Sequence, residues 1–103
     1  MKEREVDPVT LAVIWNAMST INEEIGERVL KAAQSFIMAS ARDLAPMLFD
    51  WKDRQVEIGE YNPAHTAGGR MAHNAVIQKY KGEIHPRDAF LGNDPYTIRG
   101  GHL

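Results

Sequence analysis

Two short segments concentrate the side chains that can do chemistry. The first is "HTAGG", from His65 to Gly69, and the second is "NDPYTIRGGH", from Asn93 to His102. Each sets a histidine close to a glycine pair, and glycine lets backbone N–H groups approach a bound anion closely. A neutral imidazole in such a place can bind a divalent metal or transfer a proton. These two segments are therefore the candidate functional residues.

The segment "HTAGG" leads into an expected helix, which suggests an anion or substrate pocket. Unpaired N–H groups and the helix dipole attract negative charge to a helix N-terminus. His65, Thr66, Gly68 and Gly69 would line such a pocket. The simpler interpretation is a tight turn with a helix cap. Neither segment has the Gly-Lys-Ser/Thr or GxGxxG pattern of phosphate-binding loops.

The four histidines show no recognised zinc spacing such as HExxH. His73 and His85 are interpreted as packing or surface residues. A metal site needs three or more protein ligands, and Asp94 is a natural carboxylate companion for a histidine ligand. Asp94 equally fits as the cap of the turn that "NDP" predicts. The sequence contains no cysteine, which excludes disulfides and thiolate ligands.

The adjacent pair Arg42-Asp43 has three open interpretations. It fits an ion pair, a clamp for a substrate carboxylate, or two surface side chains. The sequence does not decide between them.

One long helix is expected to begin the chain. Asp7 is a good N-cap and Pro8 suits the first helical position. Gly26 lies inside the helix and weakens it by about 1 kcal/mol relative to alanine. Apolar residues recur at spacings of three and four: Leu11, Ile14, Met18, Ile21, Ile25 and Val29. This stripe is interpreted as core or subunit packing.

The rest of the chain predicts a hairpin and a second helix. Pro46 rules out a continuous helix before the hairpin. Segments 47–50 and 54–59 flank a turn, and alternation in "RQVEI" is typical of a half-buried strand. Residues 60–69 are expected to form a loop, followed by a helix from about Arg70 to Tyr80 that ends at Gly82. The predicted class is α+β: a long amphipathic N-terminal helix, a second helix and short, mostly antiparallel strands.

Length and composition are those of one ordinary globular domain, residues 1–103. Apolar residues make up 44% and charged residues 25% of the sequence, and the formal net charge is -2. No basic patch indicates a nucleic-acid partner. No apolar run approaches the roughly 20 residues that cross a bilayer, and the polar start lacks a secretory core. A cytoplasmic location is the expectation.

Four segments together resemble a known family. They are "DPVTLAVIWNAMSTINEEIG", "SARD" with "LFD", "HTAGG" and "GNDPYTIRGGHL". They stand in the order found at the N-terminus of the hydantoinase B/oxoprolinase family, and "NDPY" followed by a glycine pair and "HL" is the most specific. One departure is Arg87 in "HPRD", where the family often has glycine, and it affects only the details of that turn.

The resemblance implies one half of a two-component enzyme. The other half would be a hydantoinase A-type subunit of the actin-like superfamily, which binds ATP. Together such proteins open hydantoins, 5-oxoproline or lactams, and relatives carboxylate acetone or acetophenone. Their shared logic would be phosphorylation of a carbonyl or enol oxygen. The leading hypothesis is a subunit of an ATP-dependent amidohydrolase that opens a cyclic amide, and the alternative is a subunit of an ATP-dependent ketone carboxylase, which is a ligase. Nothing in these residues separates a lactam from a ketone as the substrate. A third possibility is a non-catalytic assembly chain that docks through its N-terminal helix.

The resemblance also implies a metal ligand. In related ketone carboxylases a His-x-x-Asp segment binds a catalytic metal, and His102 falls on that histidine. We therefore expect His102 to bind zinc, manganese or iron, with Asn93 and Asp94 shaping the site. The family continues after "HL" with Pro-Asp. The chain is thus expected to be an N-terminal segment that is inactive without the rest of the hydantoinase B-type chain.

Overall fold

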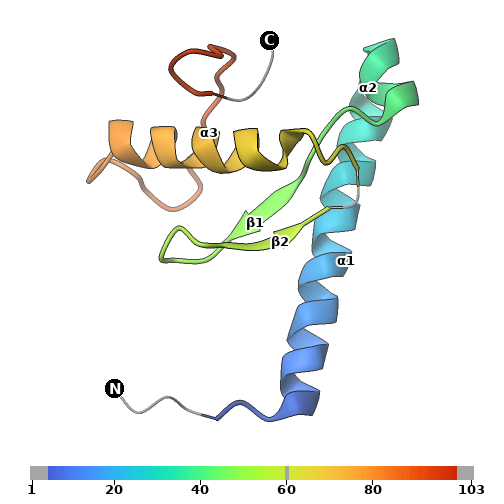
Figure 1. Ribbon diagram of the computed structural model, residues 1–103, viewed down its shortest axis with the longest axis vertical. Helices are drawn as coiled ribbons and strands as arrows, with labels where there is room; N and C mark the ends of the chain where they lie inside the picture. The colour runs from blue at the N-terminus through green and yellow to red at the C-terminus, as the bar shows by residue number, and fades with distance from the viewer. Residues whose placement is uncertain (1–4, 60, 100–103) are drawn as a thin grey trace.

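The computed structural model describes residues 5–59 and 61–99. Its elements, in chain order, are α1 (Pro8–Ala32), α2 (Phe36–Ala41), β1 (Met47–Phe49), β2 (Gln55–Ile58) and α3 (His65–Lys79). The hairpin β1–β2 projects from the side of α1, and α3 runs across the direction of α1 (Figure 1). The predicted α+β class is confirmed.

Helix α1 begins as the sequence predicts. The Asp7 carboxylate accepts a hydrogen bond from the Thr10 backbone N–H at 3.0 Å, and Pro8 is the first helical residue. That backbone bond, together with one from the Thr10 hydroxyl, lowers the pKa of Asp7 below its ordinary value. The helix ends where Ala33 turns to an extended conformation.

The apolar stripe of α1 does not form a core within the described part of the chain. Five of its side chains are exposed: Leu11 (54%), Ile14 (48%), Ile21 (51%), Ile25 (40%) and Val29 (41%). The buried positions of the helix are instead Asn22 and Gly26, on an adjoining face. The expectation of a core is therefore wrong for these residues, because α1 packs through that narrower face. Packing of the stripe against another subunit stays a prediction.

The narrow face of α1 receives the segments on either side of the hairpin. A side chain at Gly26 would overlap the ring of Tyr61, whose hydroxyl donates to the Glu23 carbonyl at 3.2 Å. The Asn22 amide nitrogen donates to the Pro46 carbonyl at 3.0 Å. Pro46 precedes β1 and Tyr61 follows β2, so α1 holds both ends of the hairpin. Gly26, expected only to weaken the helix, makes this contact possible.

The predicted antiparallel hairpin is confirmed. Met47 pairs with Ile58, and the register shifts between Leu48 and Phe49. In its turn the Asp50 carboxylate accepts the N–H groups of Lys52 and Arg54, each at 2.9 Å. The expected alternation of burial along β2 is absent: its first three residues are half-buried and Ile58 is 36% exposed. In the described part of the chain the hairpin is covered only in part: α1 contacts β2, and His73 of α3 stacks on Phe49 of β1.

Helix α2 was not predicted. It has six residues, and the Ser35 hydroxyl caps it by accepting the Met38 N–H at 3.5 Å. A single helical turn and a half is too short to show an apolar period. It ends at Arg42, whose φ of 54° lies in the left-handed region.

Helix α3 begins earlier than predicted, at His65 rather than near Arg70. "HTAGG" is therefore the start of the helix, and the expected loop is wrong there. The Asn62 side chain accepts the Ala64 N–H at 3.0 Å and starts the first turn. Gly69 lies where a side chain would come within 2.5 Å of the Met47 sulfur. The absence of a side chain at Gly69 lets α3 approach β1. The glycine pair was interpreted as a sign of a turn, but Gly69 is required for this helix–strand contact.

The segment after α3 folds back along the helix. Gly82 has a φ of +86° just beyond the helix end, which agrees with the predicted stop. The ring of Phe90 lies 4.8 Å from that of Tyr80. Between this segment and α3 is an open cavity of about 740 Å³, lined by Val76, Tyr80, Phe90 and Ile98 among others.

We expect Gly26→Ala to destabilise the protein by about 1–3 kcal/mol, the usual cost of overpacking. Glycine to alanine inside a helix ordinarily stabilises by about 1 kcal/mol, so the sign is diagnostic. Urea unfolding followed by circular dichroism measures it. In a Tyr61→Ala background the same change should become neutral or stabilising, because the obstructing ring is gone. Stabilisation by Gly26→Ala alone would contradict the contact.

Candidate functional site

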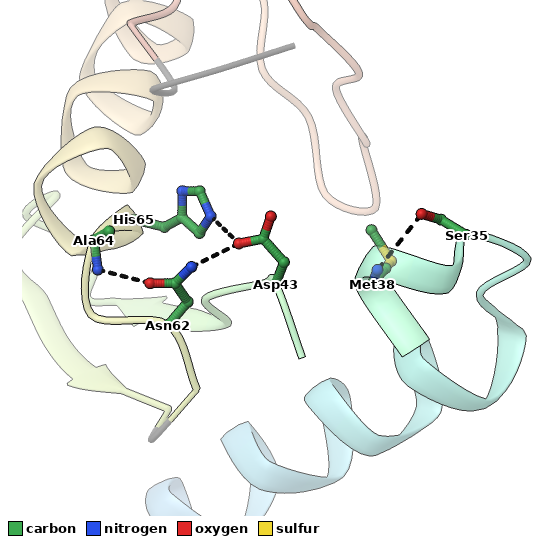
Figure 2. A network of polar contacts seen from close by, with 6 residues as sticks. All are labelled: Ser35, Met38, Asp43, Asn62, Ala64 and His65. Carbon is green, nitrogen blue, oxygen red and sulfur yellow. Dashed lines mark hydrogen bonds and ion pairs between the residues drawn. The ribbon is translucent and has the colours of Figure 1, made fainter. Parts of the chain in front are cut away.

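The strongest candidate site is a cluster of three polar side chains, Asp43, Asn62 and His65 (Figure 2). The Asn62 amide nitrogen donates to Asp43 Oδ1 at 2.6 Å. His65 Nε2 lies 2.6 Å from the same oxygen. The histidine and the aspartate side chains are each 18% exposed. A carboxylate, an amide and an imidazole thus meet around one oxygen atom.

Backbone contacts bring the three residues together from distant parts of the sequence. Asp43 follows the left-handed residue that ends α2. The Asn62 N–H donates to the Leu44 carbonyl at 3.1 Å, which joins the segment after α2 to the segment after β2. The Asn62 carbonyl then accepts the His65 N–H at 3.2 Å. His65 consequently starts α3 with its ring directed at Asp43 (Figure 2).

The arrangement suits proton transfer or metal binding. With Asp43 ionised, Nε2–H donates to it, and in a neutral ring of that tautomer Nδ1 carries the lone pair. Carboxylate oxygen and imidazole nitrogen are also ligands that zinc, manganese and iron accept. Two such groups do not make a complete site. Residues 5–59 and 61–99 contain no group of three or more metal-ligating side chains of this kind.

Sequence reasoning singled out His65 but not its partners. The structure resolves the Arg42-Asp43 pair: Arg42 turns to Glu27 of α1, and Asp43 turns to His65. Although Arg42 and Asp43 are adjacent in the sequence, their side chains contact different helices. Asn62 lies in the segment 60–69, for which the sequence predicted only a loop. No local spacing could have revealed that Asn62 and His65, which lie 19 and 22 residues after Asp43, contact its carboxylate.

The other predicted residues of "HTAGG" lie in the first turns of α3. Thr66 lines an open hollow of about 530 Å³ with Gln55, Pro63 and Arg70 among its other walls. Gly69 faces Met47 across the contact with β1. A substrate-binding role for Thr66, Gly68 and Gly69 stays a prediction.

The predicted site residues of the second segment, Asn93 and Asp94, follow α3 by more than ten residues. The Asp94 carboxylate accepts the Tyr96 N–H at 2.9 Å and the Thr97 hydroxyl, so it caps its own turn as one interpretation had it. The Thr97 hydrogen bond is the main cause that lowers the pKa of Asp94. Asn93 is exposed. His102 lies outside the described residues, and its role stays a prediction.

The remaining histidines behave as expected. His73 stacks on Phe49 with ring centroids 3.8 Å apart, and its Nε2 lies 3.1 Å from Asp53 Oδ1. His85 is a surface residue whose side chain is 75% exposed beside Asp88. The first is a packing residue between α3 and the hairpin, and the second is a surface residue.

Comparison with known proteins settles the family. A family model described as hydantoinase B/oxoprolinase matches residues 7–103. The chain belongs to this family. No solved structure matches it significantly.

Three relatives show how much of this family's length is present. The caprolactamase subunit beta of Pseudomonas jessenii is 31% identical over 95% of this chain and 17% of its own. The 5-oxoprolinase PfmaA of Pestalotiopsis fici is 25% identical over 96% of this chain and 8% of its own. An uncharacterized protein of Schizosaccharomyces pombe, C11D3.14c, is 29% identical over 99% of this chain and 8% of its own length. The hydantoinase B/oxoprolinase segment thus spans less than a fifth of each relative.

None of the helices in the described ranges is both long and apolar enough to cross a bilayer.

The two capped aspartates predict different responses to loss of a threonine hydroxyl. The Thr97 side chain is the largest cause of the lowered pKa of Asp94, whereas the Thr10 backbone N–H is the largest for Asp7. Thr97→Val should therefore remove the largest cause and raise the pKa of Asp94 toward 3.8, whereas Thr10→Val leaves the largest cause of the lowered pKa of Asp7 in place. Carboxyl ¹³C shifts followed against pH measure both.

The sign of the linked stability follows from the direction of these shifts. A carboxylate whose folded pKa is depressed stabilises the fold above its unfolded pKa and loses that contribution as pH falls through the folded value. The wild type should lose the contribution of Asp94 to its free energy of unfolding as the pH falls below 3.8. In Thr97→Val this contribution is smaller, so acidification should remove less stability. An Asp94 titration unchanged by Thr97→Val would contradict the assignment.

Proposed function

We propose that this hydantoinase B/oxoprolinase chain forms part of a subunit of an ATP-dependent amidohydrolase that opens a cyclic amide. The observation that carries the proposal is the family match over residues 7–103. Two of the relatives are named for caprolactam and 5-oxoproline, and both compounds contain an amide within a ring. A hydantoinase A-type partner would bind ATP and activate the carbonyl oxygen.

The residues of this chain would handle protons in that reaction. Ring opening needs a proton for the departing amide nitrogen and a base for the attacking oxygen. The pair of Asp43 and His65 offers both, since the carboxylate holds the imidazole in one orientation and tautomer. Asn62 fixes the carboxylate through the same oxygen. The expected substrate contacts of Thr66, Gly68, Gly69, Asn93 and Asp94 belong to this proposal.

A divalent metal is part of the proposal. His102 would bind it, with Asn93 and Asp94 shaping the site as the resemblance implies. The Asp94 carboxylate also caps its own turn. A bound zinc, manganese or iron ion supplies Lewis-acid polarisation of oxygen.

A second function has its own support, which is docking through α1. Leu11, Ile14, Ile21 and Ile25 stand exposed along one stripe of the helix. Exposed apolar surface of this kind is typical of an interface. The rest of a hydantoinase B-type chain, or the partner subunit, would cover it. A docking role and a catalytic one are compatible.

The substrate class is tested with the protein purified together with its ATP-binding partner. Ring opening of ε-caprolactam, 5-oxoproline or hydantoin should depend on ATP and need no bicarbonate. Turnover of acetone or acetophenone that requires bicarbonate, with no ring opening, would replace the proposal by the ketone-carboxylase alternative. A complex inactive on all of these would favour a purely assembling role.

The metal assignment is tested by His102→Ala in the same complex. Bound metal should fall to about a tenth or less, and turnover by about 100-fold or more, because a site that loses a ligand binds weakly. Mass spectrometry of the metal gives a readout independent of activity. His85→Ala is the matched control, since His85 is a surface side chain. Undiminished metal and turnover in His102→Ala would rule out this ligand.

A further inference from the structure

Two adjacent residue pairs face opposite ways where the segment after α2 meets the segment after β2. Toward α1, the Arg42 guanidinium carbon lies 4.7 Å from the centre of the Tyr61 ring. Toward α3, the next residues along, Asp43 and Asn62, are hydrogen-bonded at 2.6 Å. The bond from the Asn62 N–H to the Leu44 carbonyl holds the two segments side by side. The α1 side of this junction is therefore mechanically linked to the candidate site.

The α1 side is held by a set of mutual contacts. Arg42 forms an ion pair with Glu27, and that hydrogen bond raises the pKa of the guanidinium. The Tyr61 hydroxyl lies 3.2 Å from the Glu23 carbonyl and 3.4 Å from Glu27 Oε1. The ring itself covers Gly26. Arg42 thus lies between a carboxylate that belongs to α1 and an aromatic ring that packs against α1.

We propose that Arg42 is a positioning residue for the site: its grip on Glu27 and Tyr61 aims the Asp43 carboxylate at His65. Arg42 has a φ of 54°, a left-handed conformation that non-glycine residues seldom adopt. Local preference alone does not favour that turn, so the side-chain contacts select it. The left-handed conformation of Arg42 then sets the direction of the Asp43 side chain. The inference rests on the proposed role of Asp43 and His65.

The positioning effect should be separable from folding. The Arg42 and Glu27 side chains are 51% and 46% exposed, and ion pairs this open contribute little to overall stability. Their loss should loosen the geometry around Asp43 while α1 and the hairpin remain folded. The Tyr61–Gly26 contact, which does hold the fold together, is left untouched.

The test uses Arg42→Met and Glu27→Gln in protein carrying ¹⁵N-labelled histidine. We expect solvent exchange of the His65 Nε2–H to speed up by about tenfold or more, the signature of a local opening. The unfolding equilibrium constant should change by less than about threefold. Arg42→Lys keeps the charge but not the planar fork, so it should recover part of the protection. Glu24→Gln, an exposed glutamate on the same helix, is the matched control and should change neither quantity.

The outcomes separate this inference from the proposed function. A His65 signal indifferent to both Arg42→Met and Glu27→Gln would overturn the positioning role, even if Asp43→Asn abolished ring opening. If exchange of the His65 Nε2–H speeds up in these variants but the complex with the partner subunit opens no cyclic amide, the positioning role is supported and the proposed function is not. If Arg42→Met fails to fold, Glu27→Gln decides, because it leaves the guanidinium on the Tyr61 ring.

Discussion

The structure depends on how closely two segments approach one face of α1. Asn22 and Gly26 are the buried residues of this helix. Gly26 has no side chain, so the Tyr61 ring can lie against the helix, and Asn22 reaches the Pro46 carbonyl with its amide. Because these contacts fall just before β1 and just after β2, they fix the hairpin. They also fix the start of α3, which follows Tyr61 by only a few residues.

A conventional apolar core does not share this task in the part of the chain described. No hydrophobic side chain there is buried, and large ones such as Ile14 and Trp15 of α1 are about half exposed. Burial of apolar surface is worth roughly 25 cal/mol per Å², so exposed surface of this extent is a large unused source of binding energy. Shape is set here by backbone hydrogen bonds, by a few polar side chains and by half-buried contacts such as those of Tyr61 with Gly26 and of His73 with Phe49. The apolar stripe remains available for a partner.

Sequence predicted well where the cause of structure is local. Asp7 and Pro8 start α1 through contacts within one turn, and the Asp50 turn closes the hairpin. It failed where the cause lies across the fold. Gly69 suggested a loop, but a glycine stands there because any side chain would overlap the side chain of Met47 in β1. His65 was selected for its glycine neighbours, whereas its chemistry comes from Asp43, a residue 22 positions away. Pairings of that range are products of tertiary structure and leave no period in a sequence.

The geometry around Asp43 has an electrostatic consequence for any partner that covers it. One oxygen of the carboxylate receives both Asn62 and His65, and the His65 and Asp43 side chains are each 18% exposed. Coulomb interactions strengthen as the effective dielectric falls from that of water toward that of a protein interior. A chain that covered the start of α3 would remove the remaining water and tighten the hold of the carboxylate on the imidazole.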